Sequence, residues 1–321
     1  MLLPACIKGS PVLIYGPRKA GTTLAQNLHD GSSQIFVYPW ELKLKFLTAR
    51  FFPPDLVSML ELYKQSSRTY PIKFVNYEGY QKTLTEPPVI KVSGLRDLIL
   101  NDIISTYQSV EPSVRPDSSG TWLAKEVGGS PHGILRAWRH LFSDGRVIMM
   151  LRHPLMVVRS VILDRRRKNV RLGFRSIYRE VAECFRVLNA QVEYVGESGV
   201  MFITYERLTE DPEREMRRSC KFLDIDYHHV FSHPTVFGEP TVVRTSSKAR
   251  RDVFRNQNGW HKDLTPRELF CVLLSFLIVW IRNSGWRRQG VFQAGGYREM
   301  TKGLYPTEQD ANDHRNSAAH S

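Results

Sequence analysis

Short apolar runs alternate with longer amphipathic stretches along most of the chain. Runs typical of buried strands cover residues 11–15, 35–38, 121–125, 146–151 and 200–204. Helical periodicity or helix-start signals follow them at residues 21–30, 131–142, 154 onward, 174–195 and 213–223. Because strands that alternate with helices pair in parallel through right-handed crossovers, the pattern predicts an α/β fold. We expect a three-layer domain with a central, mainly parallel sheet flanked by helices.

The stretch between the second and third predicted strands is the least regular part of the chain. Residues 41–120 hold helix-like pieces at 41–50, 55–66 and 95–110, and proline and glycine interrupt them. An irregular insertion of this size between core strands is where a cover over an acceptor substrate is expected.

The C-terminal part begins with a loop-like, basic stretch and ends in an apolar helix. Residues 225–260 carry no regular pattern, and capping signals then precede a strong apolar run at 269–281. That run is shorter than the roughly 20 residues that span a bilayer. We expect a buried helix there, with docking on a membrane surface as the alternative. We predict one domain over residues 1–305 and a disordered polar tail over 306–321.

The charge balance favours anionic partners. Lysine and arginine number 45 against 32 aspartates and glutamates, which gives a formal net charge of +13 at pH 7. Such an excess suits a nucleotide, a nucleic acid or a membrane surface. The densest run, Arg165–Lys168, is also typical of a solvated helix end.

Two features bear on the compartment. The four cysteines form no CxxC pair, which favours buried thiols in a reducing environment over disulfides or a zinc site. Because a strand signal begins by residue 11, we expect no leader peptide and predict a cytoplasmic location.

The most informative segment is the loop between the first predicted strand and helix, Gly16-Pro-Arg-Lys-Ala-Gly-Thr-Thr23. Glycines five residues apart let the backbone curl so that its N–H groups converge, and the following helix adds its positive end. The hydroxyls of Thr22 and Thr23 can donate further hydrogen bonds. This pattern predicts a P-loop-like phosphate cradle.

The loop departs from the Walker A pattern GxxxxGK[ST]. Thr22 stands where the Walker lysine would be, and a lysine appears three places earlier, at Lys19. The ammonium group therefore lies inside the loop, which disfavours an ordinary ATP or GTP hydrolase.

Gly16–Thr23 resembles the 5′-phosphosulfate-binding loop of the sulfotransferases that use 3′-phosphoadenosine 5′-phosphosulfate. In that family the loop wraps the 5′-phosphate, and a lysine, here Lys19, reaches the bridging oxygen of the departing nucleotide. A second segment, Val147–Ser160, resembles the 3′-phosphate-binding strand and helix, with Arg152 at the strand end and Ser160 eight residues on. A third, Tyr205–Pro212, is similar to the family's Y-E-x-L-x-x-D-P segment, whose tyrosine lies against the adenine.

The resemblance implies a set of residues that bind the donor. They are Pro17, Arg18, Lys19, Ala20, Gly21, Thr22, Thr23, Arg152, Ser160 and Tyr205. Physical chemistry agrees at Arg152, since ligands of open α/β sheets bind at the carboxyl ends of the strands and arginine presents a planar donor fork to phosphate.

The general base takes two forms in this family. One form is the histidine of a K-x-H segment. In this chain the corresponding segment is Lys125-Glu126-Val127, so valine stands where the histidine would be. Glu41, soon after the second predicted strand, matches the glutamate of the carbohydrate and protein-tyrosine branches, although it also suits a helix N-terminus. Lys125 matches a lysine near the transferred group. Ala124 stands where an acid is expected, and Glu126 is a second candidate base.

These features are typical of a soluble, bacterial-like sulfotransferase with Lys19, Glu41 and Lys125 as catalytic residues. We expect a nucleotide donor, no metal and no nucleic-acid partner. The acceptor is expected to be a hydroxyl or amine of a carbohydrate or other small metabolite. The alternatives are a nucleotide kinase with the same loop, and a protein that binds nucleotide or polyanion without turnover.

Overall fold

A computed structural model describes residues 9–42, 44, 95–111, 115, 120–241, 243–244, 249–250, 253 and 259–282. The chain divides into two compact units, which are described separately. The first comprises residues 1–152 and 196–257, and the second comprises residues 153–195 and 258–321.

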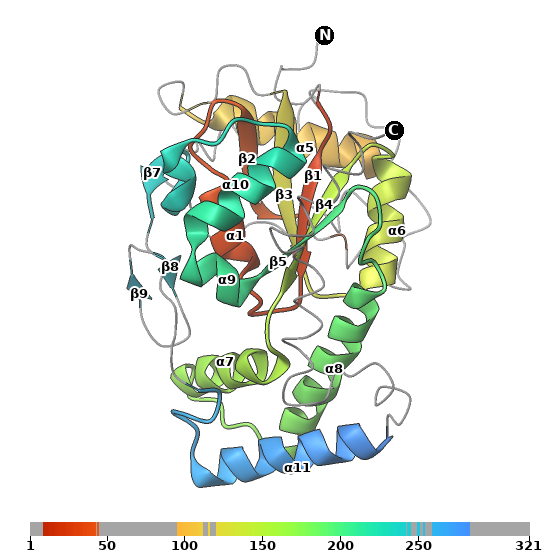
Figure 1. Cartoon of the computed structure of the whole chain (residues 1–321), viewed down its shortest axis with the longest axis vertical. Coiled ribbons are helices and arrows are strands. Elements are labelled where there is room, and N and C mark those ends of the chain that lie inside the picture. Colours follow the sequence, from red (N-terminus) through yellow and green to blue (C-terminus); the bar gives the residue numbers. More distant parts are fainter. Residues whose placement is uncertain are drawn as a thin grey trace, which may run out of the picture. The chain divides into compact units, whose positions relative to one another are not determined.

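A parallel five-stranded sheet forms the centre of the first unit (Figure 1). Its strand order is β2-β3-β1-β4-β5, and every neighbouring pair is parallel. The strands are β1 (Val12–Gly16), β2 (Ile35–Glu41), β3 (Thr121–Val127), β4 (Arg146–Leu151) and β5 (Val200–Thr204). These strands begin within one residue of the predicted ones, which confirms the α/β class.

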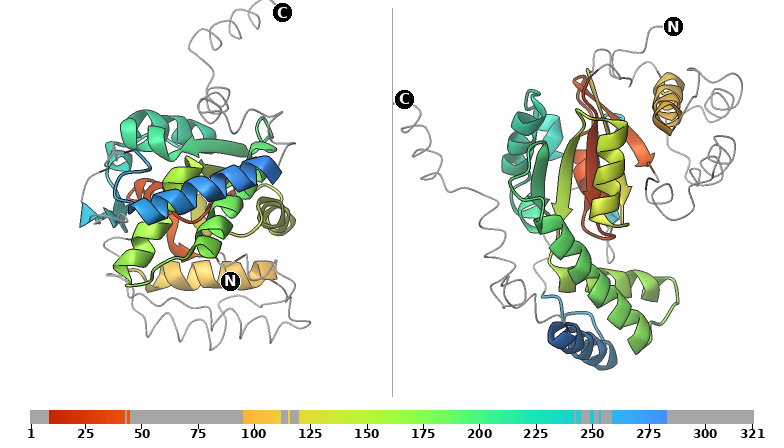
Figure 2. Two further views of the ribbon diagram at one scale, coloured as in Figure 1. Left: turned by 90° about the horizontal axis from the view of Figure 1, so that it is seen from below. Right: turned by 90° about the vertical axis from the view of Figure 1, so that its right-hand side faces the viewer.

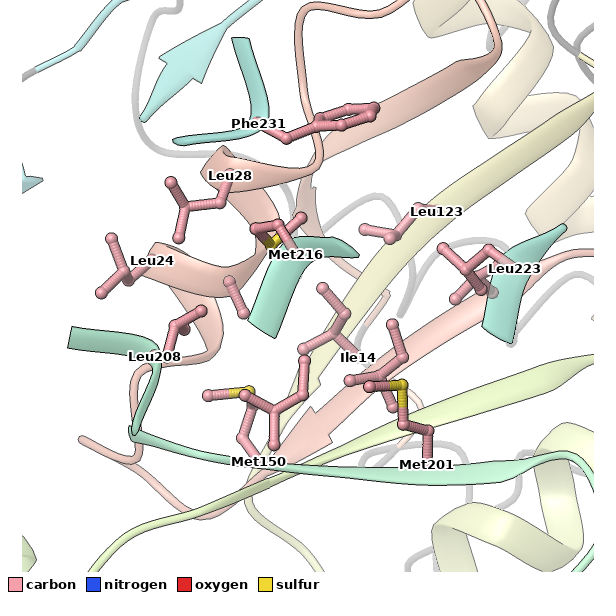
Figure 3. Packing of buried hydrophobic residues seen from close by; sticks show 14 of the residues in the cluster. Ile14, Leu24, Leu28, Leu123, Met150, Met201, Leu208, Met216, Leu223 and Phe231 are labelled. Carbon is pink, nitrogen blue, oxygen red and sulfur yellow. The ribbon is translucent and has the colours of Figure 1, made fainter. Parts of the chain in front are cut away.

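Helices cover both faces of this sheet (Figure 2). One face carries α1 (Thr22–Leu28), α9 (Tyr205–Glu210) and α10 (Pro212–Leu223), and the other carries α5 (Leu95–Ser109) and α6 (Pro131–Leu141). On the first face the alternate strand residues Ile14, Leu123 and Met150 pack against Leu28 and Met216 (Figure 3). This alternation is what a sheet buried on both sides requires.

Several elements differ from the prediction. Strand β2 continues to Glu41, where a helix was expected to begin, and its register against β3 shifts between Val37 and Glu41. Pro39 lies inside that shift, and a proline in a strand is found at an irregularity because it lacks an N–H to donate. Helix α9 was not predicted; Thr204 caps it by accepting a hydrogen bond from the Arg207 N–H.

The stretch expected to be a loop contains short pieces of regular structure. They are η3 (His229–Ser232) and two antiparallel ribbons, in which β6 (Thr235–Val236) pairs with β7 (Glu239–Pro240) and β8 (Val243–Arg244) pairs with β9 (Ala249–Arg250). The tail at 306–321 and the helix predicted at 55–66 lie outside the described residues, as does the one at 41–50 apart from residues 41, 42 and 44.

The second unit contains α7 (Pro154–Arg167), α8 (Phe174–Val192) and α11 (Pro266–Arg282). Their apolar faces meet around Val158, Val181 and Val272. Arg159 is buried and forms an ion pair with Asp263, which precedes α11.

Cys184 and Cys271 lie in this core, and Cys220 lies in the first unit. All three are buried free thiols, which confirms their predicted role as small buried residues. None of the helices in the described part of the chain has both the length and the apolar character that a membrane span requires.

A buried histidine ties the phosphate-loop helix to α10. His29 follows α1, and its Nδ1 lies 2.7 Å from the Ala25 carbonyl oxygen while its Nε2 lies 2.7 Å from Ser219 Oγ on α10. Because a carbonyl can only accept, Nδ1 carries the proton and Nε2 accepts from the serine hydroxyl. Burial lowers the pKa of His29 from 6.5 to about 4.

This histidine makes stability depend on pH. Above about pH 6.5 the ring is neutral in both states, whereas below it the unfolded chain takes up a proton that the folded chain accepts only near pH 4. The free energy of unfolding should therefore fall as the pH falls through this window, by about 3 kcal/mol in total. Urea unfolding across that range tests this against His29→Gln, which should lack this component. Identical pH profiles for the two proteins would contradict it.

Candidate active site

The predicted site residues in the first unit gather at the carboxyl edge of its sheet. Strand β1 pairs with β3 on one side and with β4 on the other. The chain leaves β1 toward β2 and leaves β4 toward β5, so the connections diverge between these two central strands. Ligands of open α/β sheets bind at such a switch point. The loop after β1 and Arg152 after β4 meet there.

The phosphate loop is a tight turn that ends on a glycine. The Ala20 N–H donates to the Pro17 carbonyl at 3.2 Å, and Lys19 has a left-handed φ of 64°. A lysine in that conformation is strained, and such strain persists only where the surroundings impose it. Gly21 has a φ of 98°, and a Cβ there would lie 2.5 Å from Tyr205 Cδ2. Glycine is therefore needed at 21 for both conformation and space.

Arg152 and Tyr205 pack on this loop. The Arg152 guanidinium carbon lies 4.0 Å from the centre of the Tyr205 ring, and Nη1 donates to the Lys19 carbonyl oxygen at 2.6 Å. Tyr205 is the first residue of α9, directly after β5. Three segments that are distant in the sequence thus converge, which is the convergence expected from the resemblance. The guanidinium is held by a cation–π contact and a hydrogen bond to the loop backbone.

Lys125 reaches the loop from the neighbouring strand. Its side chain is buried, and Nζ donates to Thr23 Oγ1 at 3.0 Å. Glu41 is in register with Lys125 across the β2–β3 pair. Register partners on parallel strands point to the same face, so both side chains lie on the face that carries α1. Glu41 is half-buried.

Glu126 points the other way, because successive strand residues alternate between faces. It is fully buried and accepts a hydrogen bond from the Leu44 N–H at 2.6 Å. Through this hydrogen bond the Glu126 carboxylate fixes the backbone at Leu44, just after β2, which is a structural role. The geometry therefore favours Glu41 over Glu126 as the carboxylate next to Lys125.

The remaining predicted residues divide between the two units. Pro17, Ala20 and Thr22 lie in or beside the loop, with Ala20 and Thr22 buried, and Arg18 is exposed. Ser160 is buried in α7, which belongs to the second unit. Its pairing with Arg152 on one phosphate stays a prediction.

Sequence reasoning missed a support under the loop. The Gly128 N–H donates to the Gly16 carbonyl at 2.9 Å, and the Tyr15 hydroxyl donates to the Gly129 carbonyl at 3.0 Å. Both glycines have positive φ. The sequence signal for this support was the dipeptide Gly128-Gly129 after an apolar strand, because two adjacent glycines mark a turn.

The cationic side chains at this edge of the sheet suit a polyanionic nucleotide. Lys19, Lys125 and Arg152 bring three cations to one edge of the sheet, and the first turn of α1 has no acidic residue. Among the described residues, no three or more histidines, cysteines, aspartates or glutamates lie close enough together to hold a metal ion. Arginine and lysine beside a glycine turn are the groups that proteins use for phosphate and sulfate.

Comparisons with known proteins point to the family that the sequence motifs resemble. A model described as the Sulfotransferase family matches residues 11–229. Protein-tyrosine sulfotransferase A of Caenorhabditis elegans is 28% identical over 128 residues, which cover 37% of this chain and 32% of the relative. The protein-tyrosine sulfotransferase of Drosophila melanogaster is 30% identical over 116 residues, which cover 34% of this chain and 23% of the relative.

A solved structure is also similar to this chain. The sulfotransferase domain from the curacin biosynthetic pathway aligns with a TM-score of 0.46 at 15% identity, over 87% of this chain and 98% of that domain. The two curated relatives are matched over only a minor part of their length. The family model, in contrast, extends from just before β1 to η3, which is more than half of the chain, and this chain therefore belongs to the sulfotransferase family.

Proposed function

We propose that this protein transfers a sulfuryl group from 3′-phosphoadenosine 5′-phosphosulfate to a hydroxyl or amine of an acceptor. The observation that carries the proposal is the convergence of Lys19, Lys125 and Arg152 at the carboxyl ends of β1, β3 and β4, with Glu41 in register beside Lys125. Membership of the sulfotransferase family supports it.

In the proposed reaction the acceptor oxygen or nitrogen forms a bond to sulfur while the bond from sulfur to the bridging oxygen of the donor breaks. Glu41 takes the proton from the acceptor. Lys19 stabilises the negative charge that develops on the departing bridging oxygen, and Lys125 neutralises the transferred group. This division of roles suits a transfer in which positioning and electrostatic stabilisation supply most of the catalysis.

Donor recognition is proposed to rest on two phosphate subsites. The turn from Pro17 to Thr23 would hold the 5′-phosphosulfate, and Arg152 with Ser160 would hold the 3′-phosphate. The Tyr205 ring, already stacked on Arg152, would lie beside the adenine. The position of Arg152 is supported by its hydrogen bond to the Lys19 carbonyl, which links the two subsites.

Of the two acceptor groups, a hydroxyl is the one that the proposed glutamate base favours. A glutamate base is what the carbohydrate and protein-tyrosine branches use, and the two matched curated relatives are named protein-tyrosine sulfotransferases. A carbohydrate, a small metabolite and a tyrosine-containing peptide are therefore the acceptors to test. We also propose a cytoplasmic location and no metal requirement.

The direct test is transfer from radiolabelled donor to panels of glycans, lipids, small phenols and tyrosine peptides, with release of adenosine 3′,5′-bisphosphate as the second readout. We expect labelled product and released nucleotide in equal amounts. Tight nucleotide binding with neither product on any panel would favour the non-catalytic binding protein, and turnover that needs ATP and magnesium would favour the kinase.

The phosphate subsites predict nucleotide selectivity. Adenosine 3′,5′-bisphosphate should bind more tightly than AMP by about 2–4 kcal/mol, because AMP leaves the Arg152 subsite without an anion. Arg152→Gln should remove most of this difference, whereas Arg214→Gln, which neutralises an exposed cation on α10, should retain it. Calorimetric titration of the two nucleotides measures the effect, and equal affinities in the unmodified protein would refute the 3′-phosphate subsite.

A further inference from the structure

Helix α11 buries one side and leaves large apolar side chains in solvent on the other. In the second unit α11 packs against α8 through one face, whose buried members are Cys271, Val272, Ser275 and Val279 (Figure 1). The exposed members are Phe270, Leu273, Leu277 and Ile281, each between 48% and 65% exposed. The sequence left a buried helix and a membrane-docking helix as alternatives, and α11 has a face suited to each.

The exposed side chains form a continuous stripe. With 3.6 residues per turn they fall within about 80° of the helix circumference, opposite the buried face. Along the axis the stripe extends for about 17 Å. Exposed apolar residues are common singly, but a contiguous row on one helix marks an interaction surface.

A cationic segment contacts both ends of α11. Residues 165–179, which end α7 and begin α8, contain seven lysines and arginines and no acid. Arg166 forms an ion pair with Glu268 at the start of α11, and Arg282 at its end donates to the Tyr178 hydroxyl at 3.2 Å. Both ends of α11 are thus fixed to the segment that carries the cations.

Within the described residues of the unit, cations outnumber acids. Arg166, Arg167 and Lys168 form ion pairs with Glu268 or Asp164, but Arg171 and three further cations are also exposed or half-buried there. The described part of the unit carries twelve lysines and arginines against six aspartates and glutamates. Val170 and Phe174 add exposed apolar groups inside the cationic segment.

We propose that α11 and residues 165–179 form a docking surface for an anionic lipid membrane, with α11 lying in the plane of the interface. The apolar stripe would enter the boundary between headgroups and acyl chains, and the cations would face lipid phosphates and carboxylates. An apolar helix face flanked by lysine and arginine is the combination that binds peripheral proteins to anionic bilayers. This inference is independent of the proposed sulfuryl transfer.

Charge complementarity selects the membrane over a second copy of the chain. Two copies that met through the α11 stripe would bring two sets of cations together, because the cationic segment is tied to both ends of the helix. Like charges at close range oppose such an association. An anionic bilayer satisfies the apolar stripe and the cations at once.

Sedimentation of the full chain with lipid vesicles tests the proposal. The unmodified protein should pellet with phosphatidylcholine vesicles that contain phosphatidylserine and much less with phosphatidylcholine alone, and added salt should weaken the binding. Leu273→Gln with Leu277→Gln should lower the partition coefficient at least tenfold. Glutamine is a good helix former, so this variant should keep α11.

The cations are tested separately. Arg171→Gln with Arg175→Gln should lower binding to the anionic vesicles by about thirtyfold at low ionic strength. The matched control is Arg214→Gln with Lys221→Gln, which removes the same charge from the exposed side of α10 and should bind like the unmodified protein. Val195→Gln is the control for the apolar stripe, since that valine is exposed elsewhere.

Three outcomes would overturn the proposal. One is failure of the unmodified protein to sediment with anionic vesicles at low salt. Another is undiminished binding by the Leu273/Leu277 variant. The third is a dimer in light scattering that this variant dissociates, because the stripe would then serve self-association. In each case sulfuryl transfer to a water-soluble acceptor can be measured independently.

Discussion

Replacing Glu41 with glutamine is expected to lower kcat by about 10²–10⁴-fold while the affinity for adenosine 3′,5′-bisphosphate stays nearly unchanged. The amide keeps the shape of the side chain but cannot take the acceptor proton, and loss of a general base costs about this much. The nucleotide should bind normally because Glu41 faces the acceptor side of Lys125 in the proposed site. Steady-state rates and calorimetric titration measure the two quantities.

The pH profile distinguishes a base from a positioning residue. The pH dependence of kcat should differ between the unmodified enzyme and Glu41→Gln if Glu41 is the base, and should be the same if it only positions the acceptor. A variant that remains active would refute this assignment. If Glu126→Gln were inactive in the same assay, the base would have to be sought on the strand that carries Lys125.

Most of the fold was predictable because the strands are buried on both sides. A strand covered by helices on both faces appears as an apolar run, as at 146–151, and parallel connections then limit the topology. The prediction was wrong where local signals conflicted. Glu41 resembles the first acid of a helix, but pairing with β3 keeps the chain extended past Pro39. Such tertiary pairing has no signal within a short window of sequence.

The sequence predicted which segments meet at the candidate site, but not the contacts between them. The order of Gly16, Lys19 and Gly21 after a strand predicts a phosphate loop. The stacking of Arg152 on Tyr205 and the hydrogen bond from Lys125 to Thr23 join segments more than fifty residues apart. Sequence alone also left two carboxylates as candidate bases. Strand alternation separates them, because Glu126 lies on the opposite face from Lys125 and holds the Leu44 N–H.

The stripe on α11 illustrates the same limit. The apolar run at 269–281 predicts a helix but not which of its residues are covered. Only the packing against α8 separates the buried Val272 from the exposed Leu273. An apolar run whose one polar residue is Ser275 is ambiguous for this reason, since periodicity cannot assign sides when nearly every position is apolar.

Lys19→Ala is expected to lower kcat by about a hundredfold or more and to weaken donor binding much less. The bridging oxygen of the donor gains charge only as its bond to sulfur breaks, so the ammonium group acts mainly on the transition state. Arg152 would still hold the 3′-phosphate in the variant. Single-turnover rates at saturating donor, with calorimetry of the bisphosphate, separate the two effects.

The backbone of Lys19 needs its own control, because this residue has a left-handed φ of 64°. Alanine keeps the cost of that conformation and glycine relieves it, so the two variants differ in strain but both lack the ammonium group. Equal losses of turnover in Lys19→Ala and Lys19→Gly would therefore assign the effect to the charge. Near-normal turnover in both variants would mean that the loop holds phosphate without acting on the leaving group. Turnover lost in the alanine variant and restored in the glycine variant would assign the effect to loop geometry, and the source of leaving-group stabilisation would then have to be Lys125.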